Sequence, residues 1–432
     1  METEKKPIEL MIIGAGTRGM ISYGKIIKKG DVNVKVVGVA DIDPEKVEKM
    51  REEYDIPEEN CFETGMDALE KDKFCDAVLI TTPNWEHYDL TMKALDKGYH
   101  VLLEKPMSPD PKECVEIVRK QEKTGKILSI AHVLRYTSFF QKIKEIIDSG
   151  ELGKMYHIDL LEDVCYWHFA HSFVRGNWRR KEESGPVLLT KSCHDMDILT
   201  WLINSDVDSI LSFGSLKYFK EKNSPKGSTE RCTDDCKIKD KCPFNAEKFY
   251  LEEEDPEQVK WPVRGISPMD KTIEARKKAL KEGPFGRCVY RCDNDVNDNQ
   301  EVLIKFSNSV TARFILTSLG SDSTRKIKIF FERGIVHGDF LEGSIRIVTY
   351  SGLGKKGNDV HQMDLPYKKG HGGGDEGLLR SFVKSIHEKH HESNITGAKE
   401  SLQSHLMAFA TEESIEKNRE IDFQEYKRVL GL

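Results

Sequence analysis

One stretch, from residue 8 to residue 41, limits what this chain can fold into more than any other. An apolar run over 8–13 is typical of a buried parallel strand, and it stops abruptly at Gly14-Ala15-Gly16-Thr17-Arg18-Gly19. In such a turn the first glycine allows the tight bend, the second lets a pyrophosphate approach the backbone, and the third lets the following helix pack on the strand. We therefore predict a dinucleotide cradle made by Gly14, Gly16, Thr17, Arg18 and Gly19.

A glycine pattern of this kind also occurs in flexible loops, so the sequence around it decides. A second apolar run over 34–40 ends at Asp41, about 20 residues beyond the glycines, where an acidic side chain can accept both hydroxyls of an adenosine ribose. Such a carboxylate repels a 2′-phosphate, which favours NAD over NADP. The alternative role for Asp41 is to cap the helix that begins near Pro44, and Asp43 is better placed for that.

Strands and helices alternate through the first 132 residues. We predict further strands at 77–80, 100–103 and 127–132, and helices at 44–54, 66–71, 86–97 and 111–124. This order is typical of a doubly wound parallel sheet, and we place a dinucleotide-binding domain at residues 1–132.

The alternation stops beyond residue 132. We predict strands at 155–164, 210–219, 300–306, 310–317, 326–331, 335–339 and 344–350, and helices at 139–149, within 187–203, at 376–388 and at 398–417. This pattern indicates a second α/β domain over 133–432 with a mainly antiparallel sheet. A charged, cysteine-bearing segment at about 220–299 fits neither pattern and is predicted to be an insertion.

Composition narrows the classes of partner and compartment. The net charge of −7 is spread over residues of both signs, which argues against nucleic acid or an acidic membrane as a partner. No apolar stretch has the length of a transmembrane helix or the form of a signal peptide. We expect a soluble cytoplasmic protein whose ten cysteines are mostly reduced.

Glu104-Lys105-Pro106 follows the strand predicted at 100–103. Doubly wound folds bind their ligands at the carboxyl ends of such strands. A lysine there can hydrogen-bond a substrate hydroxyl and stabilise oxygen charge while a hydride leaves carbon, and burial would lower its pKa. The alternative is a solvated Lys–Glu pair that follows a strand.

A second polar cluster lies at residues 190–197. On a helix, His194 and Asp197 share one face, and a histidine can take a hydroxyl proton while Asp197 orients it or binds a hydroxyl. The alternative is a helix whose polar end simply points inward, with Lys191 and Asp195 as a surface ion pair.

These motifs, together with Pro83-Asn84-x-x-His87, resemble the Gfo/Idh/MocA family of nicotinamide-dependent sugar and cyclitol oxidoreductases. The resemblance implies a Rossmann domain followed by an α/β domain with a large open sheet, and a homodimer or homotetramer formed through that sheet. It implies that Lys105 and His194 are the catalytic pair and that Asp197 contacts substrate. Asn84 and His87 would lie near the nicotinamide end of the cofactor, beside Glu104 and Lys105.

One position departs from the family pattern. Many relatives have an aspartate four residues before the catalytic histidine, where this chain has Thr190. Threonine cannot act as the carboxylate partner of a histidine base, so the proton relay must differ. Lys191 is a candidate for a charge contact with substrate instead.

Two further segments are candidates for substrate contact. The segment 166–180 is rich in aromatic, histidine and arginine side chains, and we predict that it forms a substrate wall; the alternative is a packing loop at an interface. His371 precedes three glycines, which suits ligand contact or a mobile lid, with Asp375 as a possible helix cap. The predicted contacts are Trp167, His171, Arg175, Trp178 and His371.

Five cysteines fall in or near the predicted insertion: Cys232, Cys236, Cys242, Cys288 and Cys292. Their spacings are not the usual Cys-x2-Cys pairs of zinc sites, so a structural zinc, free thiols and disulfides all stay open. We assign no metal to the active site.

These observations predict an NAD-dependent dehydrogenase that transfers a hydride between nicotinamide and a secondary hydroxyl of a sugar, sugar derivative or cyclitol. Two alternatives are an NAD-retaining glycosidase and a non-catalytic dinucleotide-binding sensor. The presence of both Lys105 and His194 speaks against the sensor.

Overall fold

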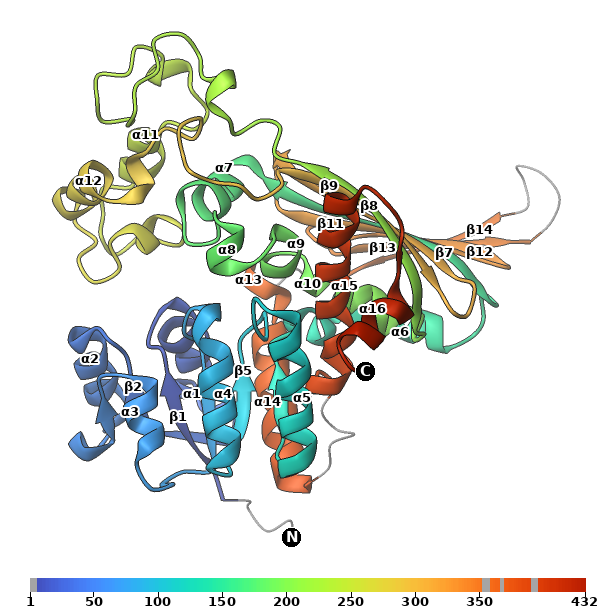
Figure 1. The fold of residues 1–432 in the computed structure, drawn as a ribbon, viewed down its shortest axis with the longest axis horizontal. Helices are drawn as coiled ribbons and strands as arrows, with labels where there is room; N and C mark the ends of the chain where they lie inside the picture. The colour runs from blue at the N-terminus through green and yellow to red at the C-terminus, as the bar shows by residue number, and fades with distance from the viewer. Residues whose placement is uncertain (1–5, 352–357, 366–368, 390–394) are drawn as a thin grey trace.

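The computed structural model describes residues 6–351, 358–365, 369–389 and 395–432. Two sheets dominate it, with a parallel sheet near the N-terminus and a larger sheet beside it (Figure 1). The α/β class predicted from the sequence, with a parallel sheet followed by a mainly antiparallel one, is confirmed.

The N-terminal sheet has six parallel strands in the order β3-β2-β1-β4-β5-β6. Because all six strands run the same way, their carboxyl ends meet at one edge of the sheet. The predicted strands at 8–13, 34–40, 77–80 and 100–103 are confirmed to the residue. The strands are β1 (Ile8–Ile13), β2 (Val34–Ala40), β3 (Cys61–Phe62), β4 (Ala77–Ile80), β5 (His100–Leu103) and β6 (Leu128–Ile130).

Helices cover both faces of this sheet. Asp43 caps α2 by accepting a hydrogen bond from the Glu45 N–H at 3.1 Å, as predicted. After the glycine turn the chain forms a wide π-type helix, η1 (Thr17–Gly24), which continues into α1 (Lys25–Lys28). The other helices of this part are α2 (Pro44–Tyr54), α3 (Gly65–Glu70), α4 (His87–Asp96) and α5 (Pro111–Thr124).

One helix from the far end of the chain also covers the N-terminal sheet. Helix α14 (Gly374–Glu388) brings the side chains of Leu378, Leu379, Phe382 and Val383 into one buried cluster with β1 and β4. Helix α5 packs on the opposite face of the same sheet, so the two helices overlap in the view of Figure 1 without being neighbours. The domain boundary near residue 132 stays a prediction, with α14 returning across it.

The larger sheet has nine strands in the order β14-β13-β12-β11-β7-β10-β9-β8-β15. Its pairs are antiparallel except that β7 and β10 run parallel. The strands are β7 (Met155–Cys165), β8 (Val207–Ser215), β9 (Asn299–Phe306), β10 (Thr311–Gly320), β11 (Thr324–Phe331), β12 (Gly334–Asp339), β13 (Ser344–Tyr350), β14 (Asn358–Asp364) and β15 (Ile421–Asp422).

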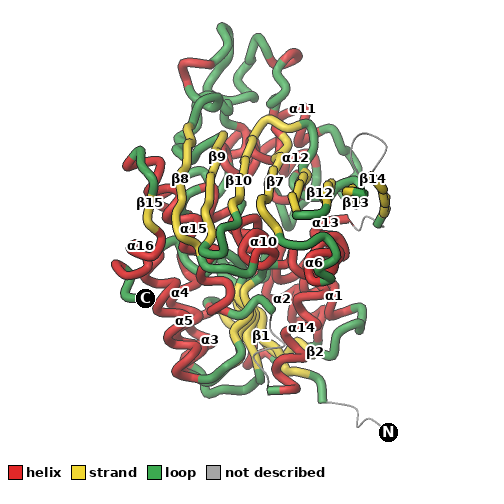
Figure 2. The backbone as a smooth tube through the Cα atoms, turned by 90° about the vertical axis from the view of Figure 1, so that its right-hand side faces the viewer, coloured by secondary structure: helices red, strands yellow, loops and turns green. Residues whose placement is uncertain are grey.

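Among the described residues, helices pack on one face of this sheet, and Figure 2 shows β8, β9, β10 and β7 from the other face, which these residues leave uncovered. The strand predicted at 210–219 was wrong at its C-terminal end, because β8 stops at Ser215. Strand β14 was not predicted. The covering helices are α6 (Ser138–Asp148), α9 (Val187–Thr190), α10 (Cys193–Ile203), α15 (Ala398–Lys417) and α16 (Phe423–Val429).

Residues 220–299, called the lobe below, stand apart from both sheets at the upper left of Figure 1. Up to the start of β9 they form short helices and loops, including α11 (Ala246–Leu251) and α12 (Ile273–Glu282). The lobe's own buried cluster is small and contains Cys232, Ala246, Tyr250, Ile266 and Leu280. None of the helices in the described ranges is both long and apolar enough to cross a membrane.

Candidate active site

The glycine turn lies at the carboxyl end of β1 and makes close contacts that exclude larger side chains. Gly14 has a φ of +95°, and a Cβ there would lie 2.8 Å from the Thr81 carbonyl carbon. A Cβ on Gly19 would lie 2.1 Å from the Gly14 oxygen. A Cβ on Gly16, in contrast, would meet no atom within 4 Å, so the backbone at Gly16 faces open space.

Asp41 lies beside this turn, at the carboxyl end of β2. Its Oδ2 accepts a hydrogen bond from the Ala15 N–H at 2.7 Å, and its Oδ1 accepts one from the Asp43 N–H at 2.9 Å. Lys46 approaches the same carboxylate at 3.4 Å. The acidic end of β2 is therefore hydrogen-bonded directly to the glycine turn.

Arg18 joins the glycine turn to the end of β5 and to α14. Its guanidinium donates to Glu104 at 2.6 Å and to Asp375 at 2.7 Å, and Glu104 also accepts from the Tyr23 hydroxyl at 2.9 Å. Burial alone would raise the pKa of Glu104, but Arg18 holds it below its ordinary value. His371 joins the network through its Nδ1, 3.0 Å from an Asp375 oxygen. Asp375 therefore binds Arg18, and Gly373 takes the helix-cap position.

Lys105 follows β5 and extends toward the second domain. Its Nζ donates to the backbone carbonyl oxygen of Thr190 at 2.6 Å, a contact that does not depend on the side chain at position 190. Burial lowers the pKa of Lys105 from its usual value. The Thr190 hydroxyl is within 3.3 Å of the Pro186 carbonyl, inside its own helix.

Asn84 and His87, predicted near the nicotinamide, are both buried and bound to backbone oxygens. Asn84 donates to the Ser184 carbonyl at 2.6 Å. The His87 ring lies between the Pro106 carbonyl at 2.7 Å and the Thr82 carbonyl at 3.0 Å. In this arrangement His87 ties the ends of β4 and β5 together and so positions Lys105.

His194 lies in the first turn of α10 and faces Lys105. It is 7% exposed, and its Nδ1 has no hydrogen-bond partner among the described residues. Burial lowers its pKa well below the usual value, and nearby Lys105 and His132 lower it further. A neutral imidazole with a free nitrogen is the form that can accept a proton.

The two aspartates of α10 are fully buried and each binds an arginine. Arg135 holds Asp197 with two hydrogen bonds of 2.7 and 2.6 Å, and Arg325 holds Asp195 with bonds of 2.7 and 3.1 Å. Each oxygen of Asp197 therefore accepts one hydrogen bond from Arg135. The surface ion pair between Lys191 and Asp195, offered as an alternative, was wrong, because Lys191 instead pairs with the buried Glu162 at 3.0 Å.

The predicted substrate wall faces the lobe along most of its length. The His171 Nδ1 lies 2.7 Å from the Tyr250 hydroxyl, and the ring stacks on Phe285 at 4.7 Å. Arg175 is 3% exposed and donates to the carbonyls of Arg287 and Phe244. Trp167 packs between lobe side chains, and Trp178 is 40% exposed.

The structure brings two histidines to the site that the motifs did not single out. The His132 ring lies 5.7 Å from that of His194, and neither of its nitrogens has a hydrogen-bond partner in the described part of the chain. His168 is near enough to Lys191 and Lys105 for both to lower its pKa, after burial, which lowers it most. His132 is the last residue of the strand predicted at 127–132, and that position is the signal that could have found it. His168 stood in the aromatic segment but was not singled out.

The residues present fit a dinucleotide. The open space at Gly16, the helix that begins at Thr17 and the carboxylate of Asp41 supply, in order, room for a pyrophosphate, amide donors and a ribose acceptor.

Comparison with known families agrees with this geometry. Residues 8–132 match the NAD-binding Rossmann fold of the Gfo/Idh/MocA oxidoreductase family, and residues 144–423 match its C-terminal α/β domain. The chain belongs to the Gfo/Idh/MocA family. Its N-terminal domain is an NAD-binding Rossmann domain of an oxidoreductase, and the resemblance seen in the motifs is confirmed.

Individual relatives are distant. A Bacillus subtilis protein named as an oxidoreductase, YteT, is 22% identical over 86% of this chain and 88% of its own length. An inositol 2-dehydrogenase/D-chiro-inositol 3-dehydrogenase of Lactiplantibacillus plantarum is 29% identical, over 47% of this chain and about half (54%) of the relative. An Agrobacterium radiobacter oxidoreductase, solved with NAD+, L-tartaric acid and magnesium, shares the fold with a TM-score of 0.67 at 13% identity, covering 97% of this chain and 99% of that one.

Proposed function

We propose that this Gfo/Idh/MocA oxidoreductase uses NAD to oxidise a secondary hydroxyl of a sugar, sugar derivative or cyclitol to a ketone, or runs the reverse reaction. The observation that carries the proposal is that half-buried Lys105 donates to the Thr190 carbonyl, four residues before the buried His194, and lies near enough to lower the pKa of that histidine. The L. plantarum relative, named as acting on inositols, supports the substrate class.

In the proposed reaction Lys105 and His194 act on the substrate oxygen. Lys105, held by the Thr190 carbonyl, donates a hydrogen bond to that oxygen and stabilises its developing charge. His194, uncharged because it is buried, receives the hydroxyl proton. A bound nicotinamide supplies the acceptor for the hydride that leaves the same carbon.

The residues around this pair are proposed to bind the rest of the substrate. Lys191 and His168 both lie near Lys105. Lys191 lowers the pKa of Lys105, and Lys105 lowers the pKa of His168. His371 lies near the other member of the pair, with its ring 6.5 Å from that of His194. All three carry donors that suit hydroxyl or carboxylate oxygens.

The first experiment offers purified protein and NAD a panel of inositols, sugars, sugar acids and glycosides, and follows the absorbance of reduced nicotinamide. With a substrate in hand, Lys105→Ala and His194→Asn should each lower kcat by about 100-fold or more. Lys49→Ala, on the exposed face of α2, is the matched control and should keep full activity.

A silent panel combined with tight dinucleotide binding would contradict the dehydrogenase. Release of free sugar from a glycoside without net change in NAD would then identify the NAD-retaining glycosidase, and no reaction at all would favour the sensor.

We propose NAD rather than NADP as the cofactor, because the Asp41 carboxylate would repel a 2′-phosphate. Asp41→Ala should weaken NAD use about 10-fold and leave NADP use equal or better. Asp43→Asn, which keeps the cap of α2, is the control. Equal preference for both cofactors in the unaltered protein would contradict this choice.

We also propose a homodimer or homotetramer formed through the uncovered face of the large sheet. Three large apolar side chains point outward there: Phe213 is 58% exposed, Leu319 49% and Leu303 43%. Sedimentation of Leu303→Lys as a smaller species than the unaltered protein is the expected result, and a monomeric unaltered protein would contradict it.

A further inference from the structure

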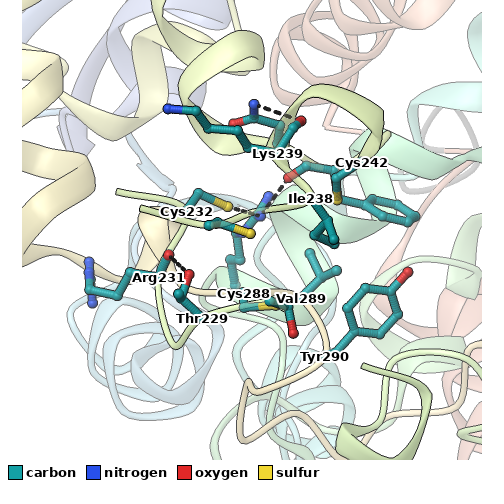
Figure 3. A pocket seen from close by; sticks show the side chains of 14 residues that line it. Thr229, Arg231, Cys232, Ile238, Lys239, Cys242, Cys288, Val289 and Tyr290 are labelled. Atoms are coloured by element: carbon teal, nitrogen blue, oxygen red, sulfur yellow. Dashed lines mark hydrogen bonds between the residues drawn. The ribbon is translucent and has the colours of Figure 1, made fainter. Parts of the chain in front are cut away.

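The lobe brings four of its cysteines to one small cavity, although they are spread over more than fifty residues of sequence. Figure 3 shows Cys232, Cys242 and Cys288 around a common space. The lining contains four thiols and no aspartate, glutamate or histidine, which leaves sulfur as the main candidate for a metal donor. The four cysteines that line it are Cys232, Cys236, Cys242 and Cys288.

The backbone holds these thiols together from two directions. Cys232 donates its N–H to the Gly286 carbonyl at 2.8 Å, and Cys288 donates its N–H to the Glu230 carbonyl at 2.9 Å. This antiparallel bridge pairs Arg231 with Arg287 and so places the first and last cysteines diagonally across it. Between them the chain turns at 239–241 and brings Cys242 back to the same cavity.

A buried cation stands at the same place. Arg175 donates to the Cys232 Sγ at 3.7 Å and to the Phe244 carbonyl at 2.8 Å, and no carboxylate of the described residues lies within 4.0 Å of its guanidinium. Arg276 is also buried in the lobe, but its three hydrogen bonds all go to carbonyls. A buried charge calls for a counter-charge, and thiolates are the groups beside Arg175 that can supply it.

We propose that Cys232, Cys236, Cys242 and Cys288 bind one structural zinc ion as thiolates, with Arg175 as the counter-cation of the negatively charged centre. Four sulfur donors are a set that zinc prefers in structural sites. The cavity, at about 10 Å³, has room for one atom-sized occupant.

Zinc binding here is a ligand exchange without oxidation or reduction. Each thiol loses its proton to solvent as its sulfur–zinc bond forms, and the ion gives up its water ligands. In the described residues no three metal-binding side chains are already gathered into a site, and all four cysteines are free, so the thiols must turn inward together.

The lobe needs such a crosslink more than the rest of the chain does. Its separate buried cluster contains five of the described side chains, among short helices and loops, while Phe244, Val289 and Tyr290 pack into the main core instead. Small units with little core are commonly stabilised by metals or disulfides. The same lobe supports the segment that carries His168, because Tyr250 and Phe285 hold His171.

The test begins with the full-length protein purified without chelators or added metal. Elemental analysis should find about one zinc per chain, and titration with a mercurial thiol reagent should release that zinc after about four equivalents. This measurement needs no variant. A chain without zinc, iron with acid-labile sulfide in its place, or a disulfide between any of the four cysteines would overturn the proposal.

Variants then assign the ligands. Cys236→Ser should lower the zinc content at least about 10-fold. Cys292→Ser is the matched control, because Cys292 lies in the same lobe but does not line the cavity, and it should keep its zinc. Loss of zinc in Cys292→Ser, with retention in Cys236→Ser, would overturn the assignment.

Discussion

Two regions contain buried arginines: the floor of the site, by which we mean α10 with Arg135 and Arg325, and the contact between Arg175 and the lobe. The arginine charges are neutralised differently in the two regions. Under α10, Arg135 and Arg325 each hold an aspartate with two hydrogen bonds. Arg175, from the segment 166–180, instead faces carbonyls and a thiol of the lobe. In the floor, each buried arginine has a carboxylate partner within the protein, so the floor can position Lys105 and His194 before substrate arrives. Beside the lobe, Arg175 gains a negatively charged partner only when the proposed zinc–thiolate centre forms.

Removal of Arg135 is the largest expected effect and tests the floor directly. Arg135→Met leaves the fully buried Asp197 without its partner, and the free energy of unfolding should fall by about 3–5 kcal/mol. Urea unfolding of purified protein measures it. Arg380→Met, which breaks an exposed pair with Glu376, is the control and should cost no more than about 1 kcal/mol. Equal losses in the two variants would break the comparison.

Removal of zinc should affect the lobe and spare the floor. Protein treated with a strong chelator should lose about 2–4 kcal/mol of stability, restored by added zinc. Limited proteolysis should then cut within 220–299 first, while α10 stays protected. Cleavage spread evenly over the chain would contradict a local role for the ion.

Acid should destabilise both regions through buried histidines. Burial lowers the pKa of His405, under the floor, and of His171, beside the lobe, to about 3 in each case. Between that value and the unfolded pKa near 6.5 the unfolded chain binds more protons, so stability falls as the pH falls. By pH 5 each histidine should cost about 2 kcal/mol.

His405→Gln and His171→Gln should each reduce the loss of stability between pH 7 and pH 5, as measured by urea unfolding at both values. If a variant lost as much stability between pH 7 and pH 5 as the unaltered protein, the substituted histidine would not contribute to the acid sensitivity.

The smallest effect on stability is expected for substitutions in the glycine turn. Two glycines of this turn separate a role in packing from a role in cofactor binding. Gly19→Ala places a Cβ against the Gly14 oxygen and should lower stability by about 1–2 kcal/mol. Gly16→Ala meets no protein atom, so its stability should change by less than about 0.5 kcal/mol while NAD binding weakens. Thermal unfolding and dinucleotide titration separate the two. Unchanged NAD affinity in Gly16→Ala would show that the open space belongs to another ligand.

The sequence predicted the N-terminal sheet closely because buried parallel strands are continuous apolar runs that end at polar or glycine residues. The strands at 8–13 and 77–80 are examples. Lys105 was singled out because it follows a predicted strand end, and His194 because it shares a helix face with Asp197.

The partners of these residues were beyond reach of the sequence. Asp197 was expected to contact substrate, but Arg135, which holds it, lies 62 residues earlier and carries no local signal of the pairing. The segment 166–180 was expected to contact substrate because it is rich in aromatic, histidine and arginine side chains, with a packing loop as the alternative. The lobe has no periodic pattern that would have indicated its contact with His171. Tertiary pairing decides both roles.

The return of α14 to the N-terminal sheet has a consequence for the order of events during synthesis. Strands β1 and β4 leave the ribosome early, yet Leu378 and Phe382, which cover them, are made nearly three hundred residues later than β4. A nascent chain therefore carries an uncovered apolar face through most of its translation. Contacts of such long sequence separation slow folding, and chaperone capture of the growing chain is the expected cellular consequence.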